Sequence, residues 1–84
     1  MPSHLSNASR ASTLSVIPEG TQAHIVRINA GIGIQMRLAA MRILPNSKIK
    51  MIRNMGRGPI VVSSRGNRIA LGRGLAHKIF VASV

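Results

Sequence analysis

Side chains able to carry acid–base chemistry or to bind a metal are few in this chain of 84 residues. Glu19 is the only acidic residue, the histidines are His4, His24 and His77, and cysteine is absent. These counts exclude paired-carboxylate catalysis, a Ser–His–Asp triad and a cysteine nucleophile. The histidines and Glu19 also lack the spacing of metal ligands, so we expect no metal centre, no cofactor and no enzymatic activity. We interpret His24 as an exposed or edge-strand residue and His77 as a polar residue of the last helical turn.

Two further features are weaker candidates for ligand binding, one for a metal and one for an anion. The methionines at positions 36, 41, 51 and 55 are a conceivable set of soft ligands, but we interpret them as core fillers. Gly72-Arg73-Gly74 precedes a helical turn and can offer backbone N–H groups to an anion. The alternative is a tight bend, for which glycine is the usual residue.

Positive charge is the most unusual property of the composition. Twelve Lys and Arg residues oppose one acid, for a formal net charge of +11, and ten of the twelve lie within residues 37–78. Such a field attracts anions, nucleic acid or acidic lipid head groups, although the cations can also simply be solvated. Phosphates can reach the arginines expected in or near loops, which are Arg57, Arg65, Arg68 and Arg73. Phe80 is the only aromatic residue, which argues against single-strand binding by stacking.

The chain divides into two parts. Residues 1–13 are polar and aperiodic, which predicts a mobile N-terminal tail, and residues 14–84 are expected to form one small domain. The tail lacks the apolar stretch of a signal peptide, and no apolar run approaches the roughly 18 residues of a membrane span. These features predict a soluble, cytoplasmic protein.

Turn signals and apolar periods predict the elements of the first half. Pro18-Glu19-Gly20 is read as a type I turn with Pro at its second position. A strand follows over residues 21–28, with a bulge near Val26 because both faces carry apolar residues there. Residues 30–33 are expected to open a loop before a short amphipathic helix carrying Ile34, Leu38 and Met41.

The second half is predicted to be a series of strands. Residues 44–47 form a type II turn, with Pro45 second and Asn46 third. Residues 48–55 form a strand whose buried face carries Ile49, Met51 and Met55 and is interrupted by Arg53. Residues 56–59 form a loop. A hairpin follows, in which Gly66-Asn67 is the two-residue connection and Gly66 needs a positive φ. One helical turn and a closing strand complete the chain.

These elements predict a mainly β fold: a small, partly closed barrel of about five strands with one helix inserted after the first. Six side chains drawn from different elements are expected to pack together in its core: Ile25, Leu38, Ile49, Val62, Leu71 and Ile79.

The order and spacing of several motifs between residues 14 and 81 resemble the FeoA domain family of ferrous iron transport. They are the Leu-x-x-x-x-x-Gly of residues 14–20, Arg37-Leu38 in the helix, Pro45 in the turn, Gly58-Pro59-Ile60-Val61-Val62, Gly66, Ile69-Ala70-Leu71, and Ala76-x-x-Ile79-x-Val81. Arg42 departs from the family's usual helix-ending Gly, so we expect this end of the helix either to be looser or to need φ > 0 at Arg42. Asn46 replaces a turn Gly, which is a mild change because Asn tolerates that conformation.

The resemblance implies an SH3-like barrel that serves as a cytosolic accessory of a membrane ferrous iron transporter carrying a GTPase domain. It also implies no enzymatic activity and no small-molecule substrate, and it allows a peripheral position at the inner face of the cell membrane. The alternative function is a basic barrel that binds nucleic acid or another polyanion.

Charge and loop position, rather than any family site, select the residues expected to contact the partner: Lys48, Lys50, Arg57, Arg65 and Arg68. An apolar surface around Ile34 and Met41 is the alternative contact.

Overall fold

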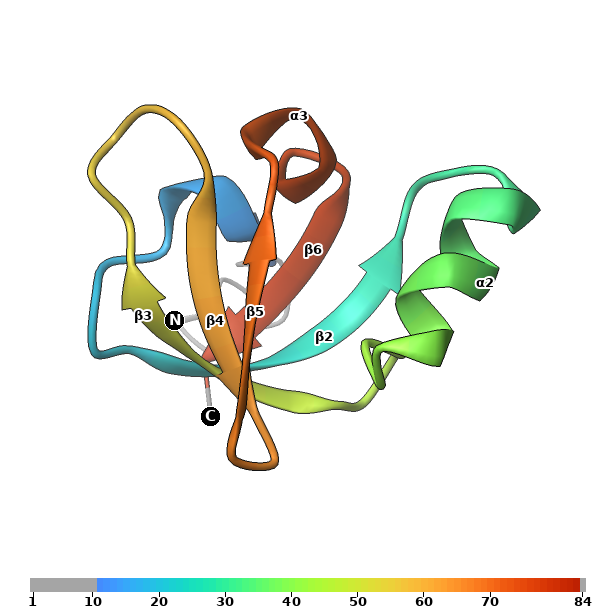
Figure 1. Ribbon diagram of the computed structural model, residues 1–84, viewed down its shortest axis with the longest axis horizontal. Helices are drawn as coiled ribbons and strands as arrows, with labels where there is room; N and C mark the ends of the chain where they lie inside the picture. The colour runs from blue at the N-terminus through green and yellow to red at the C-terminus, as the bar shows by residue number, and fades with distance from the viewer. Residues whose placement is uncertain (1–10, 84) are drawn as a thin grey trace, which may run out of the picture.

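Six short strands form one antiparallel sheet in the order β1-β6-β2-β3-β4-β5 (Figure 1). The computed structural model describes residues 11–83. The strands are β1 Ser12–Thr13, β2 Gln22–Ile28, β3 Lys48–Arg53, β4 Ile60–Ser64, β5 Asn67–Leu71 and β6 Ile79–Ser83. The helices are the 3₁₀-helix η1 Leu14–Val16, α2 Ile32–Ala40 and α3 Arg73–Ala76. The mainly β prediction, with a helix after the first long strand and a helical turn before the last, is confirmed.

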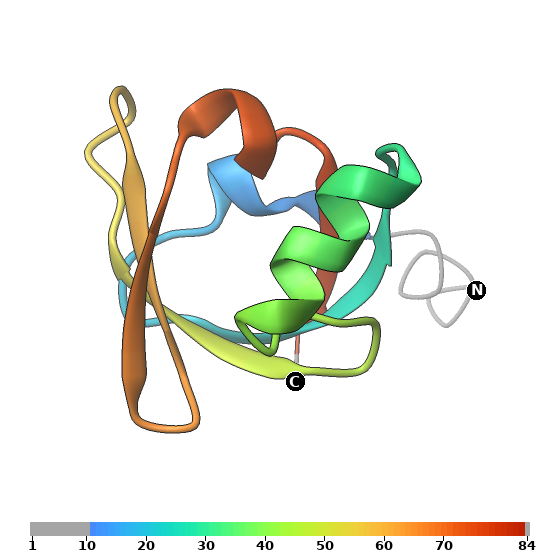
Figure 2. The same cartoon turned by 45° about the vertical axis from the view of Figure 1, so that its right-hand side comes forward.

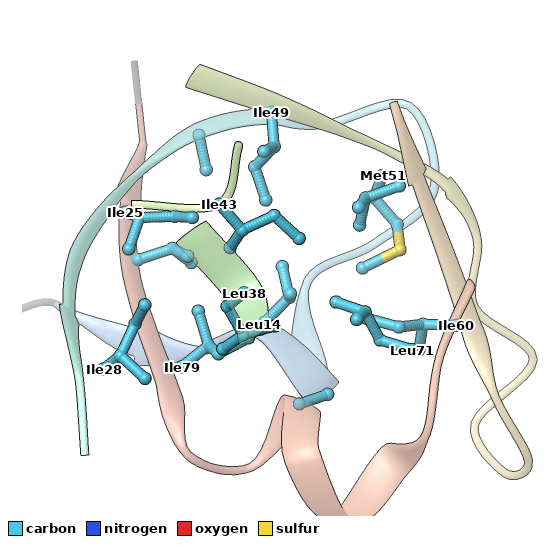
Figure 3. Close-up of a cluster of buried hydrophobic side chains, with 14 residues drawn as sticks. Leu14, Ile25, Ile28, Leu38, Ile43, Ile49, Met51, Ile60, Leu71 and Ile79 are labelled. Carbon is cyan, nitrogen blue, oxygen red and sulfur yellow. The ribbon is translucent and has the colours of Figure 1, made fainter. Parts of the chain in front are cut away.

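The sheet curls around an aliphatic core, and α2 lies beside the curled sheet (Figure 2). Alternating residues of β2, β3, β4 and β6 point inward (Figure 3). The elements η1, α2, β5 and α3 and the α2–β3 connection complete the cluster with Leu14, Leu38, Ile43, Leu71 and Ala76. All six side chains expected to pack together are at most 3% exposed. The expected packing of these six side chains in the core is therefore confirmed.

Two irregularities bend the strands. The register between β2 and β6 shifts between Ile25 and Arg27, which confirms the bulge near Val26. A second shift, between Met51 and Arg53, lies where β3 pairs with β4. An extra residue in one strand reverses the facing of the residues after it, and this second bulge was not anticipated.

Met51 is the one methionine that fills the core among the four assigned there. It is 1% exposed, whereas Met36, Met41 and Met55 are 66%, 39% and 71% exposed, so the core-filler interpretation is wrong for these three. Met55 leaves the buried face because β3 ends at Arg53, after the bulge. Met36 lies on a face of α2 that looks away from the core, which Leu38 reaches.

The turn at residues 44–47 and the conformation of Arg42 agree with the sequence predictions, whereas two other turns are displaced by one residue. Residues 44–47 form the expected turn, closed by the Ser47 N–H donating to the Leu44 carbonyl at 2.9 Å, with Asn46 at φ 76°. Arg42 adopts φ 67°, the conformation foreseen where it replaces the family's Gly. The early turn lies one residue later than expected, because the Thr21 N–H donates to the Pro18 carbonyl and makes residues 19–20 central.

The hairpin turn also differs by one residue. Its central residues are Arg65 and Gly66, with φ of 54° and 84°, while Asn67 already pairs with Ser64. Gly66 does need a positive φ, but as the second turn residue and not the first. Two positive φ values in sequence are typical of the type I′ turn that suits strand twist.

Helix α2 starts at Ile32, two residues before the expected start, so Gly33 lies inside the helix and not in a loop. Ser12 and Thr13, assigned to the tail, pair with Val81 and Phe80 of β6. Residues 1–10 of the expected tail lie outside the described residues. His24 lies on β2, an internal strand, so its interpretation as an edge-strand residue is wrong.

Candidate interaction surfaces

The side chain of Ser15 in η1 meets those of Thr13 and His77 at one end of the barrel. Ser15 Oγ lies 2.7 Å from His77 Nδ1 and 2.8 Å from Thr13 Oγ1. The single carboxylate is used elsewhere, because Glu19 Oε2 accepts a hydrogen bond from the Asn54 N–H at 2.8 Å. Within residues 11–83 no group of three or more His, Cys, Asp or Glu side chains can hold a metal ion.

Arg73 is a structural residue and not a surface cation open to phosphate. Its guanidinium donates to the Gly58 carbonyl at 3.0 Å, to the Ser15 carbonyl at 3.0 Å and to Asn54 Oδ1 at 2.8 Å. Asn54 Nδ2 in turn donates to the carbonyls of Ser15 and Ile17. These bonds tie the β3–β4 loop to η1 and α3, and Gly72 bends the chain there with an ordinary φ of −62°.

Cations gather on the outer face of the three strands β3, β4 and β5. Lys50 is opposite Ser63, and Ser63 is opposite Arg68, so the two cations flank a small residue in one row across the sheet. Lys48 lies two residues before Lys50 on the same face. Four of the five residues expected to contact the partner, Lys48, Lys50, Arg65 and Arg68, lie on or at the end of these strands and are exposed.

Arg57 is separated from this group and Arg53 joins it. Arg57 lies in the β3–β4 loop, at the opposite end of β4 from the turn that carries Arg65 (Figure 1). Arg53 was expected to interrupt the buried face of β3, but the bulge turns it outward, exposed and opposite Val61. Strict alternation places Arg53 on the same face as Ile49 and Met51, and no residue pattern in this strand was recognised as a sign of the bulge. We call the set Lys48, Lys50, Arg53, Arg65 and Arg68 the basic face.

A groove of about 340 Å³ lies between α2 and the segment that contains α3. Its apolar lining comes from Leu38, the half-buried Ile34 and Leu75, and Met41. The exposed cations Arg37 and Lys78 also line it, one from each side. The structure therefore places both residues of the alternative apolar contact, Ile34 and Met41, in one groove.

A second hollow of about 490 Å³ adjoins the Arg73 network and is lined by residues from η1, the β3–β4 loop and α3. Its polar lining groups include Arg73, Asn54 and Ser15, which already bond to one another or to backbone. It is therefore a weaker candidate than the groove. None of the helices that the structure describes is long and apolar enough to cross a membrane.

Comparison with known proteins gives a consistent family match. The model of the FeoA domain family matches residues 12–83. A protein named "Putative Fe(2+) transport protein A" from Methanocaldococcus jannaschii is 46% identical over 68 residues, which cover 81% of this chain and 82% of that protein.

Solved structures agree with the sequence match. A crystal structure described as iron uptake regulatory protein (FeoA) has a TM-score of 0.83 and 30% identity, and the match covers 88% of this chain and 99% of that one. A manganese-dependent transcriptional repressor has a TM-score of 0.81 at 23% identity over 89% of this chain and 42% of the repressor, a likeness of fold alone. The expected SH3-like fold is thus confirmed.

Proposed function

Because this chain belongs to the FeoA domain family, we propose that it acts as a cytosolic accessory that binds a membrane ferrous iron transporter carrying a GTPase domain. The family and the named relative support a role in ferrous iron transport. The scarcity of acidic residues and the lack of cysteine support a binding role and not an enzymatic one.

The groove between α2 and α3 is the observation that carries this proposal. Its lining is apolar at Ile34, Leu38 and Leu75, and cationic at Arg37 and Lys78. An apolar segment with acidic neighbours fits such a groove, because apolar burial supplies affinity while the charge pairs fix orientation. We propose that the transporter supplies a segment of this kind.

The cations expected to contact the partner remain part of the proposal. Lys48, Lys50, Arg65 and Arg68 share the basic face, and Arg57 would make a separate contact. An electrostatic contribution from exposed charges speeds association and weakens as salt rises, because screening acts over about 8 Å at physiological ionic strength.

The proposal is tested by measuring binding of the full chain to the purified cytosolic part of the transporter. Met41→Glu places a charge in the groove, and we expect it to weaken binding by about tenfold or more, the loss typical of an interface position worth over 1 kcal/mol. Met36→Glu is the matched control, because Met36 is an exposed methionine of the same helix that does not line the groove.

Equal binding by the two variants would exclude the groove as the contact. The contribution of the cations is tested by measuring the affinity of the Lys50→Gln and Arg57→Gln variants for the transporter over a series of salt concentrations. Unchanged affinity of both variants at every salt concentration would remove those two residues from the contact.

A further inference from the structure

We propose that the basic face binds the surface of an anionic lipid bilayer directly, in addition to any contact that the domain makes with a protein. The occupant is a layer of acidic phospholipid head groups. The binding site is the outer face of β3–β5, on the sheet and not in the groove between α2 and α3.

The first argument is that the cations of this face have no partner inside the described part of the molecule. Among residues 11–83, no hydrogen bond or ion pair engages the side chains of Lys48, Lys50, Arg53, Arg65 or Arg68. Other arginines are engaged: Arg73 bonds three oxygens, and Arg27 lies over the Phe80 ring at 4.5 Å from its centroid. The basic face is thus free to meet an external anion.

The second argument is that nothing on these strands offsets the charge. β3, β4 and β5 contain no acidic residue, and the positions between the cations hold the small or neutral side chains Ser63, Val61 and Ala70. Adjacent strands lie about 4.8 Å apart, so Lys50 and Arg68, two strands apart, are separated by only about 10 Å. Clusters of four to eight Lys or Arg residues beside a membrane are typical of sites that attract acidic lipids, and the basic face has five.

The third argument favours a bilayer over nucleic acid. Single-strand binders use a cationic groove with aromatic platforms, but this sheet curls around the core and presents its convex side outward (Figure 3). No aromatic side chain lies on β3, β4 or β5. One further argument for lipid binding rests on the proposed function: a domain bound to a membrane transporter lies beside lipid head groups.

The test measures co-sedimentation of the full chain with protein-free vesicles, made of phosphatidylcholine alone or with phosphatidylglycerol added. We expect binding only to the anionic vesicles, decreasing steeply as salt is raised. Each cation near an anionic surface contributes about fivefold to partitioning, so Lys48→Gln/Lys50→Gln/Arg68→Gln should lose about 100-fold.

The matched control removes the same charge from exposed positions outside the basic face, as Arg27→Gln/Arg42→Gln/Arg57→Gln, and should lose far less. Equal losses would show that net charge alone is responsible and would overturn the proposal, as would equal binding of the original chain to neutral vesicles. A duplex or single-stranded oligonucleotide that binds more tightly than anionic vesicles at the same salt, through the same three residues, would assign the face to nucleic acid instead.

Because the vesicles contain no transporter, this result is independent of the proposed function. Vesicle binding without transporter binding would support the inference alone, and transporter binding in neutral detergent without vesicle binding would support only the proposed function.

Discussion

Arginine carries out three different tasks in this chain, and neighbouring atoms decide which. Arg73 donates to three oxygens and joins segments 58 residues apart in sequence. Arg27 covers an aromatic ring, an arrangement worth about 0.5–1 kcal/mol at an exposed site. Arg53 faces solvent because a bulge reverses its facing. Residue type alone therefore does not separate a structural arginine from one available to a partner.

Arg73→Lys should lower the free energy of unfolding by about 1–3 kcal/mol. An ammonium keeps the charge but cannot reach Gly58, Ser15 and Asn54 together, which leaves hydrogen-bond partners unsatisfied. Urea denaturation measures the loss. Arg57→Lys, in the exposed loop that Arg73 holds, is the control and should change stability by less than about 0.5 kcal/mol. A similar effect of both changes would contradict the role of the guanidinium.

The candidate site was only partly predictable at this scale. Lys48, Lys50, Arg65 and Arg68 are exposed, as alternation and turn position indicate locally, and their contact with a partner stays a prediction. Arg73 was misassigned, since its partners lie far away in sequence and only the folded chain brings them together. The assembly of Ile34 and Leu75 into one groove is likewise a tertiary property.

Among the elements, the β4–β5 hairpin and α2 show how glycine can be required or dispensable. Gly66 has φ 84°, a conformation that β-branched residues resist. Gly33 has no such φ and lies inside α2, and a Cβ there would meet nothing within 4 Å. Opposite effects on stability are expected from substituting the two.

Gly66→Val should destabilise the domain by about 1–3 kcal/mol, because the hairpin turn would store the strain of a positive φ. Thermal denaturation followed by far-ultraviolet circular dichroism measures the change. An unaltered melting temperature would mean that the hairpin turn tolerates a β-branched residue or is rearranged.

Gly33→Ala should stabilise the domain by about 0.5–1 kcal/mol, since alanine loses less backbone entropy in a helix. The same denaturation experiment applies. A decrease in stability would show that Gly33 has a contact that the open space around it does not suggest.

Turns and bulges with clear sequence signals were predicted from the sequence, but the boundaries of several elements were predicted one or two residues away from their true positions. The bulge near Val26 and the turn at residues 44–47 follow from residue types next to them in sequence. The positive φ of Arg42 was expected only from the resemblance to the family, which usually has Gly at that position. The hairpin turn was displaced by one residue because Arg65 adopts φ 54°, which an arginine rarely does. Strand pairing, which fixes Asn67 opposite Ser64, overrides that local preference.

At the scale of the whole molecule, net charge opposes the compact state. The formal charge is +11, and folding brings cations of β3 and β5 within two strand spacings. Two unit charges about 10 Å apart in water repel by roughly 0.4 kcal/mol, and several such pairs act together. The aliphatic core must outweigh this repulsion.

Added salt should therefore raise the melting temperature, because screening relieves repulsion that is stronger in the folded state. Lys48→Gln/Lys50→Gln/Arg68→Gln should melt higher than the original chain at low salt and respond less to added salt. Scanning calorimetry over a series of sodium chloride concentrations measures both effects. A melting temperature that falls with salt in the original chain would show that attractive charge pairs dominate instead.

The single aromatic ring, Phe80, packs outside the aliphatic core against Arg27. With neither Trp nor Tyr in the chain, the native state has almost no near-ultraviolet circular dichroism, and its core methyl groups feel few ring currents. Weak near-ultraviolet circular dichroism and poorly dispersed methyl signals are normally taken as signs of a molten globule. In this protein both features follow from the lack of aromatic rings and not from loose packing of the core. Rigidity therefore has to be judged from amide hydrogen exchange or from the cooperativity of heat absorption.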